Sequence, residues 1–334
     1  MKKILLIRFS SIGDIVLVSP IIRALKTQLN CQLHVLSKAK YKLLYDSNPY
    51  IDKVHVFDVS EKEIIPLLKN EEFDYIIDLQ KNIRSYNVYR RLKIPRYTFP
   101  KINLRKWLIV NFKINTLPKI HIVDRYFEAV KKLGVKNDLK GLDYFTPESA
   151  FVNLDKYPVL NGNKFIGFVI GGQHKTKMLP VEKIVSIINQ LPIPVVLLGG
   201  PEDKSTGEEI KKQISHPHVM NACGSFSLHQ STSLVRQAAL IITNDTGLMH
   251  VAAAFRKPII SIWGNTIPEF GMYPYEPDTP ENVVIAEVKG LSCRPCSKIG
   301  FEKCPKGHFN CMMKQDEQFI VSEAVRILKD KINA

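Results

Sequence analysis

The sequence predicts an α/β protein made of two parallel, doubly wound sheets. Short apolar runs of strand length alternate with segments that carry apolar residues at helical spacing. This rhythm stops near residue 96 and starts again near residue 164, and paired glycines end two strands of the second half, at Gly171-Gly172 and Gly199-Gly200. Strands that alternate with helices indicate parallel sheets, and two such runs in 334 residues indicate two domains.

The first half opens with a buried strand at residues 2–7 and a turn at 9–14. Residues 15–29 follow at helical spacing but contain Pro20, so either the helix kinks there or Ser19 and Pro20 restart it as N-cap and first residue. Further strands are predicted at 32–36, 53–57 and 75–79.

The middle of the chain breaks the pattern. Between Pro95 and Pro118 an apolar stripe is interleaved with Arg105 and Lys106, and its members are Leu104, Trp107, Leu108 and Val110. The stripe fits an interfacial amphipathic helix, and it fits packing against a core at least as well. A helix is predicted at 121–133, ended by Gly134, and the segment up to about residue 163 reads as a linker.

The second half repeats the alternation. Strands are predicted at 164–170, 194–198, 219–222, 241–244 and 258–263, and helices at 181–191, 228–239 and 315–332. Ligands in open α/β sheets bind outside the carboxyl ends of the strands, so we expect a ligand crevice where both halves present these ends.

The most informative stretch is residues 241–250, where an apolar strand runs into Asn244-Asp245-Thr246-Gly247 and then into a helix that contains His250. A helix N-terminus offers free backbone N–H groups and partial positive charge, which suit phosphate. Thr246 adds a hydroxyl, and His250 lies one turn further on the same helix face. The turn chemistry alone favours an ordinary N-cap, and it is the rest of the chain that favours a phosphate site.

Three other residues stand where strands end. Asp14 follows the first strand and is a candidate general base, or else a first-turn acid that satisfies the helix dipole. Lys177 follows Gly171-Gly172 and fits a diphosphate ligand or a solvated turn lysine. Glu202 follows Gly199-Gly200, where a carboxylate often binds ribose hydroxyls. The dinucleotide and Walker fingerprints are both absent from the sequence.

Charge is unevenly distributed. The chain carries 47 Lys and Arg against 32 Asp and Glu, a formal charge of +15, yet residues 81–123 contain no acid and eleven bases, among them Arg84. Such a field attracts nucleic acid, an anionic membrane or a phosphorylated substrate. Arg8 interrupts the first apolar run before it reaches signal-peptide length, and no run is long enough to span a membrane, so we expect a cytosolic protein.

Four of the six cysteines cluster late in the chain, at Cys293, Cys296, Cys304 and Cys311, with His308 between the last two. The spacing suits a zinc site only in part because a second Cys-x-x-Cys is missing, so structural zinc remains open and a metal-dependent reaction is not expected. Cys31 and Cys223 stand in apolar surroundings and are expected in the core.

Several motifs occur together and in order. They are Ser11-x-Gly13-Asp14, Lys177-x-x-Pro180, Gly199-Gly200-Pro201-Glu202, and Asp245-Thr246-Gly247-x-x-His250 followed by Pro258 and Gly264. In these motifs the chain resembles glycosyltransferase family 9, the ADP-heptose:lipopolysaccharide heptosyltransferases. The resemblance covers nearly the whole length, although Leu179 stands where the family often has Trp, and residues 81–117 match weakly.

The resemblance implies a GT-B fold: two Rossmann-like domains, 1–150 for the acceptor and 151–314 for the nucleotide sugar, facing a central cleft. It places a last helix, in 315–334, back on the first domain. It also implies inverting transfer of a heptose or related sugar without a cofactor or catalytic metal, by a cytoplasmic enzyme that contacts the anionic inner membrane peripherally and binds no nucleic acid.

The resemblance further implies roles for named residues. Asp14 would activate the acceptor hydroxyl, and Lys177 would act on the leaving diphosphate. The donor-binding set is Thr176, Lys177, Glu202, Asp245, Thr246, Gly247 and His250, and the acceptor-facing set is Ser11, Gly13, Arg84, Arg105 and Lys106. Two alternatives stay open: a non-catalytic protein that binds nucleotide sugars, and a UDP-sugar epimerase on the same fold.

Overall fold

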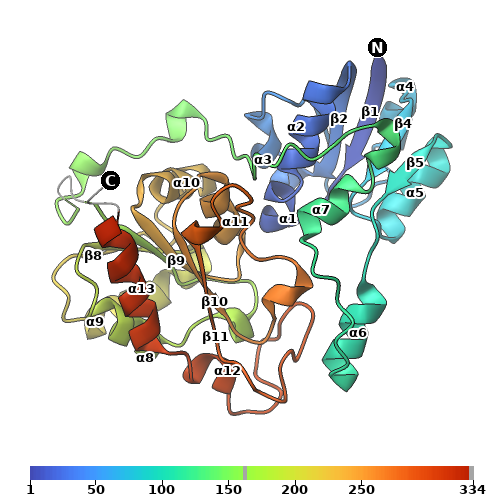
Figure 1. Cartoon of the computed structure of the whole chain (residues 1–334). Coiled ribbons are helices and arrows are strands. Elements are labelled where there is room, and N and C mark those ends of the chain that lie inside the picture. Colours follow the sequence, from blue (N-terminus) through green and yellow to red (C-terminus); the bar gives the residue numbers. More distant parts are fainter. Residues whose placement is uncertain (161–163, 331–334) are drawn as a thin grey trace. The chain divides into compact units, whose positions relative to one another are not determined.

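The computed structural model describes residues 1–160 and 164–330 and divides the chain into two compact units (Figure 1). Unit 1 comprises Met1–Lys101 and Ile120–Phe145, and unit 2 comprises Ile102–Lys119 and the described residues from Thr146 onward. The chain passes finally into unit 2 close to the boundary expected after residue 150. The first unit is not one continuous segment, however, because residues 102–119 belong to unit 2.

Unit 1 is built on a five-stranded parallel sheet in the order β3-β2-β1-β4-β5. Its strands are β1 (Lys2–Ile7), β2 (Cys31–Lys38), β3 (Lys53–Phe57), β4 (Tyr75–Asp78) and β5 (Arg96–Thr98). Its helices are α1 (Ile12–Val16), α2 (Ser19–Gln28), α3 (Leu43–Asp46), α4 (Ile65–Asn70), α5 (Ile83–Leu92) and α7 (Ile122–Phe127). Helix α2 packs with α7, and α4 packs with α5.

Unit 2 is built on a six-stranded parallel sheet in the order β11-β10-β9-β6-β7-β8. Its strands are β6 (Ile166–Val169), β7 (Val195–Leu198), β8 (Val219–Asn221), β9 (Leu240–Asn244), β10 (Ile259–Trp263) and β11 (Val283–Glu287). Its helices are α6 (Asn103–Phe112), α8 (Val181–Ile188), α9 (Lys204–Gln213), α10 (Leu228–Gln237), α11 (Gly247–Ala254), α12 (Asn310–Met313) and α13 (Glu317–Asp330).

In both sheets, all strands are parallel, but the order in which the chain adds strands changes from one side of the first strand to the other. In unit 1 the first strand, β1, lies between β2 and β4, and in unit 2 the first strand, β6, lies between β7 and β9. Doubly wound sheets bind ligands outside the carboxyl ends of the strands at this switch point. The predicted parallel α/β class is thus confirmed, and the order places Gly171-Gly172 after β6 next to Asp245-Thr246-Gly247 after β9.

The expected position of the last helix is wrong. Helix α13 buries Ile320, Ala324, Ile327 and Leu328 in the core of unit 2, and Glu317 at its start forms an ion pair with Lys183 of α8. Apolar residues at this spacing predict a helix with one buried face, but they do not say which core covers that face. The helix was expected to reach residue 332, and residues 331–334 lie outside the described part.

The structure also shows where the helices predicted at 15–29 and 121–133 begin and end. Helix α2 begins at Ser19 with Pro20 in its first turn, so proline restarts the helix, although Val18 rather than Ser19 is the N-cap. The predicted helix at 121–133 is α7 followed by a separate 3₁₀ turn, Lys131–Leu133, which ends at Gly134 with a φ of +80°. Within the described residues, no helix has the length and apolar character needed to cross a membrane.

Candidate active site

The candidate donor site lies at the carboxyl ends of β6, β7, β9 and β10 in unit 2. Close packing holds the loops there together. A Cβ atom on Gly171 would lie 2.0 Å from Asp203 Oδ2, and one on Gly264 would lie 2.8 Å from the carbonyl oxygen of Thr176. Gly172 lies beside Thr246 with more room, since a Cβ atom there would make an ordinary contact of 3.6 Å with Thr246 Cγ2. A side chain would therefore collide with the Asp203 carboxylate at Gly171 and with the Thr176 backbone at Gly264.

Asn244 and Asp245 connect the end of β9 to the lysine turn, Lys175–Lys177. The buried Asn244 amide donates to the carbonyls of Val169 and Ile170 and accepts from the backbone N–H of Leu179. Asp245 Oδ2 lies 2.6 Å from Lys177 Nζ and accepts from Thr266 Oγ1 at 2.9 Å. An ammonium has three N–H donors, so the ion pair leaves Lys177 with further donors for a diphosphate.

Helix α11 begins directly after this ion pair. Thr246 is its N-cap, in extended conformation, and its side chain makes no cap hydrogen bond to the described backbone, so the first N–H groups of the helix are not satisfied by the usual hydroxyl. Free N–H groups at a helix N-terminus favour an anion, and the turn that holds Lys177 follows β6, the strand beside β9. His250 is 3% exposed within the same helix, so it offers little surface for the expected donor contact.

Two other donor candidates are placed differently. Thr176 is buried and bonds through its backbone N–H and hydroxyl to Phe301, so in this structure it holds the lysine turn in place. Glu202 is exposed in the 3₁₀ turn Pro201–Asp203, at the carboxyl end of β7, where it is accessible to a ligand. Its neighbour Asp203 is the structural acid, since it is buried and accepts from the N–H of Gly200.

Sequence reasoning missed Asn265, which follows β10 and Gly264. Its side chain is buried at 2% exposure, and neither amide atom has a hydrogen-bond partner among the described residues. A buried amide without a partner is costly, which makes Asn265 a further candidate ligand contact. The sequence offers no signal for this residue beyond its position after a predicted strand.

The candidate base lies in unit 1. Asp14 is in the first turn of α1, where one carboxylate oxygen accepts from the backbone N–H of Ser11 at 3.2 Å and from its hydroxyl at 3.1 Å. The other oxygen lies 2.5 Å from Nη2 of Arg8. Asp14 therefore caps the helix and forms an ion pair, while its side chain remains 24% exposed.

Arg8 is a second residue that sequence reasoning missed. It is buried, and besides Asp14 it donates to the carbonyls of Ser10 and Leu79 and to the hydroxyl of Tyr126. Burial alone would raise the pKa of Asp14, but the Arg8 guanidinium and the Ser11 hydrogen bonds outweigh it and lower that pKa. Asp14 is therefore ionised at neutral pH and held in one orientation.

The acceptor-facing candidates are divided between the two units. Ser11 and Gly13 accompany Asp14 at the start of α1, and Arg84 is exposed on α5, all in unit 1. Arg105 and Lys106 lie on α6 in unit 2, with Arg105 bonded to the Thr116 carbonyl and Lys106 Nζ 4.8 Å from the centre of the Phe270 ring. The acid-free stretch thus supplies positive charge to both units.

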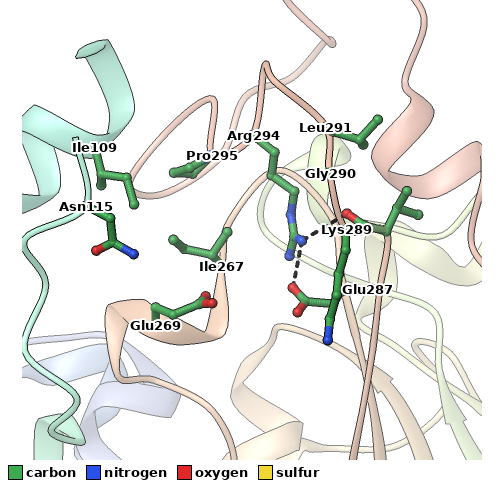
Figure 2. A pocket seen from close by; sticks show the side chains of 11 residues that line it. Ile109, Asn115, Ile267, Glu269, Glu287, Lys289, Gly290, Leu291, Arg294 and Pro295 are labelled. Atoms are coloured by element: carbon green, nitrogen blue, oxygen red, sulfur yellow. Dashed lines mark hydrogen bonds and ion pairs between the residues drawn. The ribbon is translucent and has the colours of Figure 1, made fainter. Parts of the chain in front are cut away.

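A pocket of about 420 Å³ lies in unit 2 beyond the ends of β10 and β11 (Figure 2). Ile109 and Asn115 line one side, and Glu269, Glu287 and Lys289 are among its polar groups. Arg294 crosses the pocket wall to pair with Glu287 at 2.6 Å and to bond the Val288 carbonyl. Its mixed charges suit a polar ligand or ordered water, but do not specify one.

Among the described residues, one group of possible metal ligands is already gathered within 4.8 Å: His34, His55 and Glu71 in unit 1. The Glu71 carboxylate is engaged by Lys53 at 2.5 Å and Lys3 at 3.3 Å, and these ion pairs help lower its pKa to about 2. Two ammonium groups beside the carboxylate disfavour a cation there. The group is better explained as a buried polar network, in which His34 Nδ1 lies 3.0 Å from His55 Nε2.

The chain matches known proteins along most of its length. Residues 63–300 match the model of glycosyltransferase family 9 (heptosyltransferase). The chain is 26% identical over 292 residues to the lipooligosaccharide heptosyltransferase 2 of Haemophilus influenzae, covering 80% of this chain and 84% of the relative. The lipopolysaccharide heptosyltransferase 1 of Campylobacter coli is also 26% identical, over 288 residues, with 79% and 84% covered.

Solved structures support the same fold. A family 9 glycosyltransferase from Veillonella parvula superposes with a TM-score of 0.75 at 21% identity, covering 98% of this chain and 97% of that one. The ADP-heptose lipopolysaccharide heptosyltransferase II of E. coli gives 0.71 at 21% identity, with 99% of each chain covered. Taken with the match over residues 63–300, these findings show that the chain belongs to glycosyltransferase family 9 and is a glycosyltransferase.

Proposed function

We propose that this protein transfers a heptose from ADP-heptose to an acidic lipopolysaccharide core acceptor, with inversion at the anomeric carbon. The observation that carries the proposal is the convergence of the Lys177–Asp245 ion pair with the start of α11 at the switch point of unit 2. A diphosphate fits this arrangement of ammonium and helix N–H groups. The relatives named above are heptosyltransferases of lipopolysaccharide or lipooligosaccharide, which supports heptose as the sugar.

In the proposed reaction the acceptor hydroxyl attacks the anomeric carbon opposite the diphosphate. The new carbon–oxygen bond forms as the bond to the phosphate oxygen breaks, the hydroxyl proton passes to the Asp14 carboxylate, and ADP leaves with the bonding electron pair. Arg8 is a positioning residue, since it fixes the carboxylate and keeps it ionised. A depressed pKa makes Asp14 a weaker base, so its contribution depends on proximity and orientation to the hydroxyl.

On the donor side, Lys177 and the first amides of α11 would stabilise the charge that develops on the leaving diphosphate. Preorganised donors of this kind contribute about 3 kcal/mol each to a transition state. Glu202 and Asp245 would contact the nucleoside and sugar, and Asp245 also orients Lys177 through the ion pair.

The nucleotide is tested by thermal protection of the full chain with ADP and with UDP at matched concentrations. A ligand at about 100 times its Kd stabilises the folded state by about 2.7 kcal/mol, which is readily seen as a shift in melting temperature. We expect protection by ADP and none by UDP. Protection by UDP alone would contradict the ADP-heptose assignment and favour the epimerase alternative.

We also propose that α6 brings the enzyme to an anionic membrane that carries the acceptor. Leu104, Trp107 and Phe112 are 69%, 46% and 58% exposed, while Ile109 packs inward against Ile267 and Phe270. The helix thus has a buried side that anchors it to unit 2 and exposed apolar side chains beside Arg105. Exposed aromatic and aliphatic groups next to bases are typical of interfacial helices.

Binding to phosphatidylglycerol vesicles tests this surface. The chain has two tryptophans, of which Trp263 is buried and Trp107 is half-exposed, so a blue shift on binding reports mainly on α6. We expect binding that weakens steeply with salt and falls in the double variant Arg105→Glu, Lys106→Glu. The control Lys211→Glu, Lys212→Glu makes the same charge change on exposed α9 and should lose less binding. Salt-independent binding, or none at any salt, would remove the membrane role.

A further inference from the structure

Arg294 is a buried arginine in unit 2, in the segment of residues 288–309 between β11 and α12. Its side chain is 6% exposed and pairs with Glu287 at 2.6 Å (Figure 2). The same guanidinium donates to three backbone carbonyls, those of Gly264 at 2.7 Å, Thr266 at 2.9 Å and Val288 at 3.2 Å. A planar fork of five N–H donors suits this number of acceptors, which a single ammonium could not match.

The contact with Thr266 leads to the Lys177–Asp245 ion pair. Thr266 is 2% exposed, and its hydroxyl donates to Asp245 Oδ2 at 2.9 Å. The same carboxylate oxygen lies 2.6 Å from Lys177 Nζ. Because Arg294 holds the Thr266 backbone, it fixes the hydroxyl that orients the carboxylate, and the carboxylate in turn orients the ammonium.

The contact with Gly264 leads to the backbone beside Lys177. A Cβ atom on Gly264 would lie 2.8 Å from the Thr176 carbonyl oxygen, so these two backbones are closely packed. Thr176 directly precedes Lys177. Phe301 holds Thr176 as well, since its N–H donates to the Thr176 hydroxyl at 2.8 Å and its carbonyl accepts from the Thr176 N–H at 3.0 Å. The segment that contains Arg294 therefore contacts the surroundings of both members of the ion pair.

Arg294 contributes geometry to this site rather than net charge. Glu287 lies 2.6 Å from the guanidinium and neutralises it, and the other contacts of the side chain are backbone carbonyls. The backbone of Arg294 is held in place too. Lys113 Nζ donates to the carbonyls of its two neighbours, Cys293 at 3.1 Å and Pro295 at 2.8 Å.

We propose that Arg294 is a positioning residue for the donor diphosphate, which acts through Thr266 to hold the Lys177–Asp245 pair in its binding geometry. This role rests on the proposed function, in which the pair binds the diphosphate of ADP-heptose. A site that already has the bound geometry loses less conformational freedom when the ligand enters, so its affinity is higher. Without Arg294 the ammonium would have to be ordered by the diphosphate itself.

The proposal is tested on two buried arginines by isothermal titration with ADP. Arg294→Lys keeps a positive charge for Glu287 but replaces the fork by a point ammonium. We expect this variant to bind ADP about tenfold more weakly, the equivalent of one to two ordinary hydrogen bonds. Arg23→Lys is the matched control, since Arg23 is also 6% exposed and pairs with Asp138 at 2.8 Å, but in unit 1.

The control variant should lose stability and keep its ADP affinity. If Arg294→Lys binds ADP as tightly as the wild type, or if Arg23→Lys loses as much affinity as Arg294→Lys, the positioning role is wrong.

A double-mutant cycle with Lys177→Ala separates positioning from a general loosening of unit 2. If Arg294 acts on the ammonium, Arg294→Lys should lower ADP affinity no further once the ammonium has been removed, so the two losses are not additive. A merely structural arginine would weaken ADP binding by the same factor with and without Lys177. Additive losses would therefore contradict the proposal.

A milder variant keeps the test decisive if Arg294→Lys does not fold. Thr266→Val retains a branched side chain but removes the hydroxyl that donates to Asp245. We expect ADP affinity to fall by about three- to tenfold, as for one hydrogen bond, with no further loss in the Lys177→Ala background. An unchanged ADP affinity in Thr266→Val would break the path from Arg294 to the ion pair and overturn the proposal.

The wild-type titration distinguishes failure of the positioning role from failure of the proposed function. Wild-type protein that binds ADP, beside Arg294→Lys and Thr266→Val variants of equal affinity, would contradict the positioning role alone. Wild-type protein that binds no ADP would contradict the ADP donor, and with it both proposals.

Discussion

Asp14→Asn is expected to lower turnover by about a hundred- to ten-thousand-fold, the usual contribution of a general base. The amide retains the shape of the side chain but cannot take the proton from the acceptor hydroxyl. ADP affinity should change little, because Asp14 belongs to unit 1 and the donor elements belong to unit 2. Turnover per folded enzyme and the Kd for ADP, measured on the same preparation, check this expectation.

The structure adds a second effect that must be separated from the first. Asp14 caps α1 and neutralises the buried Arg8, so Asp14→Asn should also lower the melting temperature. Asp138→Asn is the matched control, since Asp138 forms two hydrogen bonds with the buried Arg23, both at 2.8 Å, and takes no part in the proposed chemistry. It should lose stability but keep its turnover. If Asp14→Asn behaves like this control, Asp14 is a structural acid and the base assignment is wrong.

Lys177→Ala is expected to weaken ADP binding by about 1.5–3 kcal/mol, or roughly 10- to 150-fold, as for other hydrogen bonds to charged groups. Two effects contribute to this loss of ADP binding free energy. The diphosphate loses an ammonium, and the Asp245 carboxylate, which lies 2.6 Å from that ammonium in the wild type, is left to repel it. Isothermal titration with ADP measures the sum.

Two variants separate these effects. Lys175→Ala removes the same charge from an exposed position in the same turn and should change ADP affinity little. Adding Asp245→Asn to Lys177→Ala removes the unpaired carboxylate and should recover part of the lost affinity, which a double-mutant cycle quantifies. An unchanged ADP affinity in Lys177→Ala would mean that Lys177 serves only as the structural partner of Asp245.

The sequence was sufficient for most strands but missed one edge strand of each sheet. Strands β1, in the middle of its sheet, and β3, at its edge, begin and end at the predicted residues. The apolar run of β1 is typical of a strand buried on both faces. Strands β5 and β11 were not predicted. Both are edge strands with mainly half-buried side chains. Strand β5 is only three residues long, whereas β11 is a largely apolar run, Val283–Glu287, that was not recognised. Apolar periodicity detects burial, and a strand as short as β5 cannot show a period.

The candidate site could be located from the sequence but its internal contacts could not. Strand ends and glycines were enough to place Lys177 and Asp245 at one sheet edge, since carboxyl ends of parallel strands converge. Their ion pair joins residues 68 positions apart, and no local pattern predicts it. Arg8 was noted only as an interruption of an apolar run, because its role depends on partners such as Leu79 and Tyr126 that lie far away in the sequence.

We propose that this chain moves a heptose from an ADP donor to an acidic core acceptor. The most direct test incubates the wild-type protein with ADP-heptose and a heptose-deficient lipopolysaccharide core, and follows ADP release and the mass of the acceptor together. We expect one ADP released for each heptosyl residue gained by the acceptor, with the new linkage inverted at the anomeric carbon. An acceptor of unchanged mass after prolonged incubation, with folded protein that binds ADP, would contradict it.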